Sequence, residues 1–168
     1  MATHSLAAPT GSTATLTAER NGFRYGLLTA TVLCIYTLIA VLAGFFQDIT
    51  AGTLDIVFLI AGTVLAIRHF RQVRGDHMPY LGGYGTGIVA ALTASIILGL
   101  FFILLEAVFP GKLDLTQVQN VFGFELSTII AFLAIVLLGT MTGVITSLIA
   151  MQYFKVQVSD PLAMMKDR

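Results

Sequence analysis

Three carboxylates lie within or beside long apolar segments of the chain, and these are the side chains best suited to chemistry. Asp55, Glu106 and Glu125 each interrupt or border an apolar run. Ionisable side chains are costly at such positions, so each is a candidate functional residue. Carboxylates that meet in a poorly hydrated place bind a cation or pass a proton. The chemistry to consider is therefore ion binding or proton transfer.

If the apolar runs are helices, each carboxylate shares a helix face with a glycine. At about 100° per residue, the members of each pair lie within about 20° of each other. The pairs are Asp55 with Gly62, Glu106 with Gly99, and Glu125 with Gly143. If these faces meet, the three carboxylates converge near the outer leaflet. Alternatively, acids collect there because cations are excluded and helix ends tolerate charge, and we prefer this structural interpretation.

No other residue pattern indicates catalysis or metal binding. His69 and His77 with Asp76 are residue types that hold metals, but we expect ordinary solvation of a loop. The single cysteine, Cys34, lies inside an apolar run and is interpreted as a packing residue. The patterns GxSxG, HExxH and CxxC are absent from the sequence. We therefore predict that the chain is not an enzyme and has no catalytic residue, no metal and no cofactor.

Composition places the chain in a membrane. Of its residues 57% are hydrophobic and 11% are charged, and the formal net charge is zero, which gives no basic field for nucleic acid. A helix needs about 20 apolar residues to cross the hydrocarbon core. Four apolar runs reach about this length, and they cover approximately 25–46, 49–70, 80–109 and 126–154. We predict an all-α, polytopic membrane protein with four transmembrane helices arranged as two hairpins.

The same pattern divides the chain into one domain and two tails. The transmembrane domain is expected to cover residues 23–155. Residues 1–22 are expected to be a disordered cytoplasmic tail, because the first 18 carry no acid, lysine or arginine. Residues 156–168 are expected to be a second cytoplasmic tail.

The positive charges predict the orientation. If all four runs cross, eight of the nine cations lie on one side, and only Lys112 lies on the other. This bias predicts cytoplasmic N and C termini. Arg68, Arg71 and Arg74 then lie where the second span leaves the membrane on the cytoplasmic side, and the topology explains them. A site for anionic lipid head groups is the alternative. The eight cations are Arg20, Arg24, Arg68, Arg71, Arg74, Lys155, Lys166 and Arg168.

Small residues recur at intervals of four in the last two runs. Lipid provides no hydrophobic drive for helix association, so close approach through small residues must contribute. We predict that these residues pack helices together, either within the chain or in a homodimer. They are Gly83, Gly87, Ala91, Ser95 and Gly99 in the third run, and Gly139, Gly143 and Ser147 in the fourth.

Four segments resemble a bacterial family known as domain of unknown function 4199. They are "RYGLLTA", "AIRHFRQVRG", "GYGTGIVAALTASIILGLFFILL" and "GVITSLIAMQYFK". The resemblance covers residues 23–155 and implies an integral inner-membrane protein with four helices. It implies no activity and no catalytic residue. Members of the family usually have a longer loop before the last span than this chain has.

These features predict a non-catalytic accessory or assembly component of a membrane complex. The soluble segments are too short to form a catalytic domain. The expected partners are the lipid bilayer and either a larger membrane protein or a second copy, contacted through the small-residue faces, with no nucleic acid. The alternative is a small ion or proton transporter that uses Asp55, Glu106 and Glu125.

Overall fold

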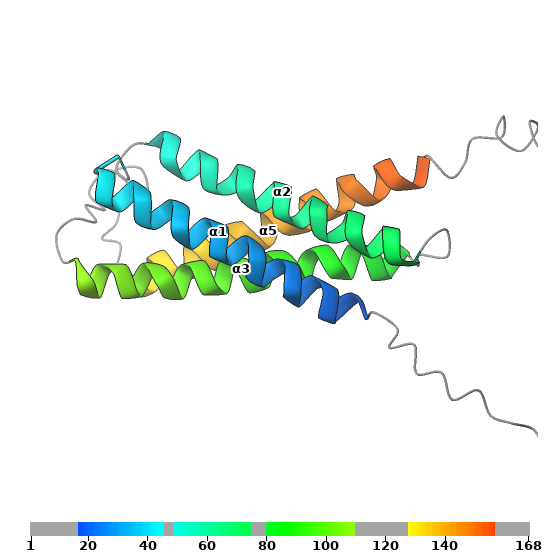
Figure 1. Cartoon of the computed structure of the whole chain (residues 1–168), viewed down its shortest axis with the longest axis horizontal. Helices are drawn as coiled ribbons and strands as arrows, with labels where there is room; N and C mark the ends of the chain where they lie inside the picture. The colour runs from blue at the N-terminus through cyan, green and yellow to red at the C-terminus, as the bar shows by residue number, and fades with distance from the viewer. Residues whose placement is uncertain (1–16, 46–48, 75–79, 110–127, 157–168) are drawn as a thin grey trace, which may run out of the picture.

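The described residues form four long helices (Figure 1). The computed structural model describes residues 17–45, 49–74, 80–109 and 128–156. Each helix is long and apolar enough to cross a membrane, as the four predicted spans require, and the described residues are all-α as predicted. Most of the two predicted tails lies outside the described residues. The helices are α1 (Ala18–Ala43), α2 (Ile49–Arg74), α3 (Tyr80–Val108) and α5 (Thr128–Val156).

Helix α1 begins earlier than the apolar run that predicted it. The Thr17 side chain accepts a hydrogen bond of 3.3 Å from the backbone N–H of Arg20, which caps the helix. At the other end, Gly44 adopts φ 81°, the left-handed conformation common after a helix. The tail predicted to extend to Gly22 is shorter than expected, because Asn21 and Gly22 are buried in the bundle.

Helices that follow one another in the chain run in opposite directions (Figure 1). Helix α3 packs extensively against both α1 and α5, and α2 packs against all three of the others. Helices α2 and α3 therefore share the centre of the bundle. Of these four helices, α5 has the least of its surface covered by the rest of the chain.

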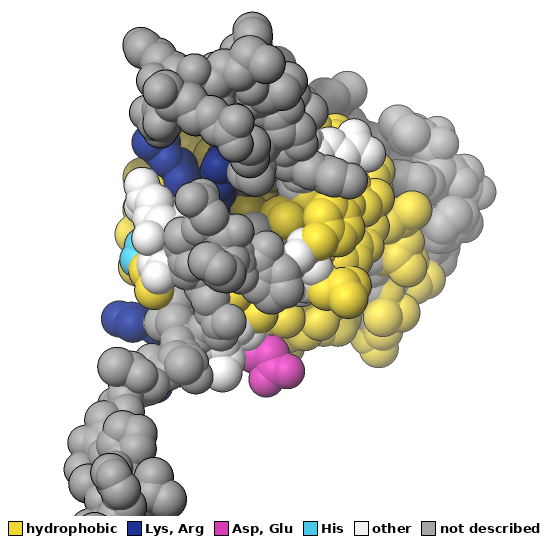
Figure 2. Space-filling model, turned by 90° about the vertical axis from the view of Figure 1, so that its right-hand side faces the viewer, with side chains coloured by type: hydrophobic (Ala, Val, Ile, Leu, Met, Phe, Trp, Pro, Cys, Tyr) yellow, Lys and Arg dark blue, Asp and Glu magenta, His cyan; other side chains and the backbone are white. Residues whose placement is uncertain are grey.

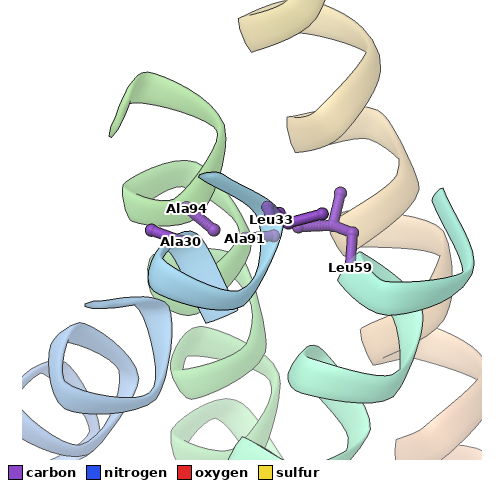
Figure 3. Packing of buried hydrophobic residues seen from close by; sticks show 5 residues of the cluster. All are labelled: Ala30, Leu33, Leu59, Ala91 and Ala94. Atoms are coloured by element: carbon purple, nitrogen blue, oxygen red, sulfur yellow. The ribbon is translucent and has the colours of Figure 1, made fainter. Parts of the chain in front are cut away.

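Small side chains fill the middle of the bundle. A cluster of buried residues joins α1, α2 and α3 (Figure 3). Three of its five members are alanines, which let the helix backbones approach closely. Leu33 and Leu59 fill the remaining space between α1 and α2. The cluster consists of Ala30, Leu33, Leu59, Ala91 and Ala94.

Truncating Leu33 is expected to destabilise this cluster. Its side chain is 1% exposed, so Leu33→Ala should leave a cavity and lower the free energy of unfolding by about 2 kcal/mol. Leu28→Ala is the matched control, because Leu28 lies on the same helix and is 62% exposed. The control should change stability by less than about 0.5 kcal/mol. Unfolding in mixed micelles, followed by circular dichroism, measures both; equal losses would contradict the packing described.

Candidate functional site

A buried amide joins α1 to α2 at the end of the bundle where α1 begins. Asn21 is 1% exposed, and its Nδ2 donates a hydrogen bond of 2.9 Å to the carbonyl of Ala66. Because a carbonyl only accepts, the amide nitrogen must face Ala66, and Oδ1 then faces His69. The Nδ1 of His69 lies 3.0 Å from that oxygen. Nδ1 therefore carries the hydrogen and donates it to Asn21.

Two further contacts strengthen this junction. The rings of Tyr25 and His69 lie 5.1 Å apart and are tilted by 42°. The Thr86 hydroxyl of α3 lies 3.2 Å from the carbonyl of Ala18. The contacts join α1 to both α2 and α3 through polar groups. Sequence analysis missed Asn21, because it placed this residue in the tail. The signal that would have found it is an amide side chain in a membrane helix, since such amides form hydrogen bonds between helices.

Arginines of two helices surround this junction. Arg20 and Arg24 of α1 and Arg68 of α2 are exposed, whereas Arg71 is half-buried. Figure 2 shows Lys and Arg side chains on both sides of the histidine. Arg74 belongs to the last turn of α2, but its side chain is outside the described part. The structure thus adds two arginines of α1 to those that sequence analysis singled out on α2.

The predicted carboxylates lie toward the opposite end of the bundle. Asp55 is in the second turn of α2, and Glu106 is in the last turn of α3. Oδ1 of Asp55 and Oε2 of Glu106 are buried and have no hydrogen-bond partner among the described residues. No hydrogen bond joins these two oxygens within the described ranges. Glu125 lies outside the described residues.

The glycines that share faces with these carboxylates pack against different helices. A Cβ added to Gly62 would collide with the Thr29 side chain of α1. A Cβ added to Gly99 would lie 2.7 Å from the Phe132 ring of α5. The face of α2 that carries Asp55 therefore turns toward α1, and the face of α3 that carries Glu106 turns toward α5. This arrangement counts against convergence of the two carboxylates.

The small-residue faces of α3 and α5 lie against each other. Gly83 is buried on α3. At the next three turns of α3, three pairs of residues meet across the two helices in antiparallel register. In each pair a Cβ added to the glycine would collide with its partner's side chain. The pairs are Gly87 with Ser147, Ala91 with Gly143, and Ser95 with Gly139. These faces are therefore occupied within the chain.

Glycines of α1 make a second close contact with α3. A Cβ added to Gly22 would lie 2.6 Å from the carbonyl oxygen of Thr86, and one added to Gly26 would lie 2.8 Å from that of Ala90. Sequence analysis did not single out these two glycines. Helix α3 thus has closely packed backbones on two sides.

Several buried hydroxyls bond within their own helix. Each donates to the carbonyl four residues earlier, at 2.6 to 2.9 Å. This bond satisfies a hydroxyl without a partner on another helix. The hydroxyls that bond in this way do not form a relay between helices. They belong to Thr29, Thr37, Thr63, Ser95 and Ser147.

Metal ligation and similarity to known proteins give no further indication of function. Among the described residues, no three His, Cys, Asp or Glu side chains are grouped to hold a metal ion. His77 and Asp76, which the sequence placed near His69, are not among those residues. No family model matches the chain, and neither a curated protein nor a solved structure matches it. Function must therefore be argued from the bundle itself.

Proposed function

We propose that the chain is a multi-pass protein of the bacterial inner membrane, with two hairpins and both termini in the cytoplasm. The sequence supports this orientation, because eight of nine cations fall on one side of four spans. The arrangement of the helices is consistent with it, since Arg20, Arg24, Arg68 and Arg71 all lie toward one end of the bundle. The resemblance to the domain of unknown function 4199 family implies the same location and stays a prediction.

We further propose that the protein acts without chemistry of its own, as an accessory or assembly component of a membrane complex. The observation that carries this proposal is the closed interior. Small residues bring α3 against α1 and α5, and five buried hydroxyls bond to their own helices. A bundle packed in this way is suited to holding a fixed shape in the membrane.

The packing also restricts how a partner binds. The small-residue faces of α3 and α5 contact each other, so a partner has to contact other surfaces. Those surfaces carry large apolar side chains, such as Leu137 and Met141 of α5, which are 62% and 56% exposed. Only 17% of the most apolar segment of α5 is buried, compared with 39% in α1 and α3. The protein therefore keeps ample apolar surface for lipid or a larger membrane protein.

Transport of an ion or proton is the second candidate function. The buried oxygens of Asp55 and Glu106, which have no hydrogen-bond partner in the part of the chain that the structure describes, favour it. Gly62, which shares a face with Asp55, packs against α1, whereas Gly99, which shares a face with Glu106, packs against α5. This difference counts against a site shared by the two carboxylates. The buried hydroxyls bond within their own helices, and this counts against a proton relay from these acids to the opposite end of the bundle.

Flux measurements with carboxylate variants separate the two functions. We expect purified protein in liposomes to give no proton or cation flux above that of empty liposomes. Asp55→Asn and Glu106→Gln should each change the free energy of unfolding by about 1 kcal/mol. The flux through both variants should stay at this background. Flux through the wild-type protein that either substitution reduces about tenfold would overturn the accessory function and establish transport. Circular dichroism of each variant would show that it is folded.

A further inference from the structure

Two arginines at the junction between α1 and α2 are not neutralised by any acid among the described residues. Arg24 and Arg68 are exposed and have no ion pair in the part of the chain that the structure describes. Of the acids in that part, only Glu19 lies at this end, where it is exposed in the first turn of α1. Figure 2 shows the resulting distribution, with Lys and Arg on both sides of the histidine.

The antiparallel register of α1 and α2 places Arg24 and Arg68 at the same level. Tyr25 contacts His69. Thr29, one turn further along α1, lies against Gly62, which precedes His69 by about two turns on α2. Arg24 precedes Tyr25, and Arg68 precedes His69. One arginine of each helix is therefore level with the Tyr25–His69 contact.

Helical geometry also places the two arginines on the same side of this contact. Around the axis of α1, the residues that face α3 lie on one side of Tyr25. Arg24 lies on the opposite side of Tyr25, about 100° from it. Around α2, Arg68 lies about 100° from His69 and likewise turns away from α3. Both guanidinium groups can therefore reach one anion on the outer side of the α1–α2 contact.

An apolar strip continues from the arginines toward the middle of the membrane. Leu28 follows Arg24 by about one turn on α1, and Leu65 precedes Arg68 by about one turn on α2. These leucines are 62% and 53% exposed. The register that aligns the arginines also aligns the leucines. We call these four residues the α1–α2 flank: Arg24, Leu28, Leu65 and Arg68.

We propose that the α1–α2 flank binds an anionic phospholipid, with its phosphate between Arg24 and Arg68 and an acyl chain along Leu28 and Leu65. A phosphate accepts hydrogen bonds from two guanidinium groups at once. Arginines near a membrane surface attract anionic lipids, and the leucines offer an apolar path for the chain. The Asn21–His69 hydrogen bond beside the flank holds α1 and α2 in the required register. The inference does not depend on the accessory function.

Lipid titration of the full chain in detergent tests this inference. Bound phosphatidylglycerol and phosphatidylcholine are counted by native mass spectrometry. We expect preferential binding of phosphatidylglycerol, and a loss of about 25-fold in its apparent affinity in the Arg24→Gln/Arg68→Gln variant, about fivefold for each arginine. The charge-conserving Arg24→Lys/Arg68→Lys variant should keep most of the preference.

A second double variant controls for net charge. Arg20 is also exposed on α1, but it lies about 140° from the direction of α2. Lys155 lies in the last turn of α5. Arg20→Gln/Lys155→Gln removes the same charge from positions that are not part of the flank, and it should weaken phosphatidylglycerol binding by less than threefold.

Three results would overturn the inference. The first is an equal loss of affinity in the two double variants, which would show attraction by bulk charge. The second is unchanged lipid selectivity in Arg24→Gln/Arg68→Gln. The third is displacement of the lipid by glycerol phosphate at equal concentration, which would show a site for soluble phosphate esters.

Discussion

Gly143→Ala is expected to lower the free energy of unfolding by about 2 to 3 kcal/mol, because the added methyl group would overlap Ala91. Ala91 is 0% exposed and belongs to α3, so it cannot move without shifting the helix. Gly85→Ala on α3 is the matched control, since a Cβ there would meet nothing within 4 Å. The control should be neutral or stabilising by about 0.5 kcal/mol, because alanine favours a helix.

A compensating substitution makes this prediction specific to the α3–α5 contact. Ala91→Gly removes the methyl group that Gly143→Ala would meet, so the double variant should recover about half or more of the loss. Unfolding of the four proteins by sodium dodecyl sulfate in mixed micelles gives the free energies. Additive effects of the two substitutions, with no recovery, would show that these residues do not meet.

Asn21→Leu is expected to cost about 2 kcal/mol of stability, because it leaves the Nδ1–H of His69 without an acceptor in a partly buried place. The carbonyl of Ala66 would also lose its contact with the amide. Gln72→Leu is the control, since Gln72 carries an exposed amide on α2. It should change stability by less than about 0.5 kcal/mol.

A double-mutant cycle isolates the Asn21–His69 interaction from other effects of the substitution. The variants are Asn21→Leu, His69→Phe and the two combined. A coupling free energy of about 1 kcal/mol is expected for a polar contact between membrane helices. A coupling near zero, with a full loss in each single variant, would contradict a direct hydrogen bond.

The helices could be predicted because the bilayer constrains them strongly. A segment that crosses lipid must satisfy all its backbone hydrogen bonds, so a long apolar run has to be a helix. The start of α1 could not be located in the same way. It depends on Thr17 as a cap and on Asn21 and Gly22 as buried residues, and none of these is apolar enough to extend the run.

Contacts between helices were only partly accessible from the sequence. The interval of four identified residues on α3 and α5 such as Ala91 and Gly143, and the structure places these two side by side. Periodicity does not say which helix a face meets. For this reason the sequence could state a meeting of the faces near Asp55 and Glu106 only as a condition. In the structure Gly62 packs on α1 and Gly99 packs on α5.

Copurification from the native membrane tests the accessory function most directly. The tagged full chain is extracted in mild detergent, purified in two steps, and analysed by mass spectrometry and light scattering corrected for detergent. We predict a larger membrane protein at a fixed ratio to this chain through both steps, and a complex mass that matches the sum. A monomer or a homo-oligomer of this chain, without another protein at a fixed ratio, would contradict the accessory function.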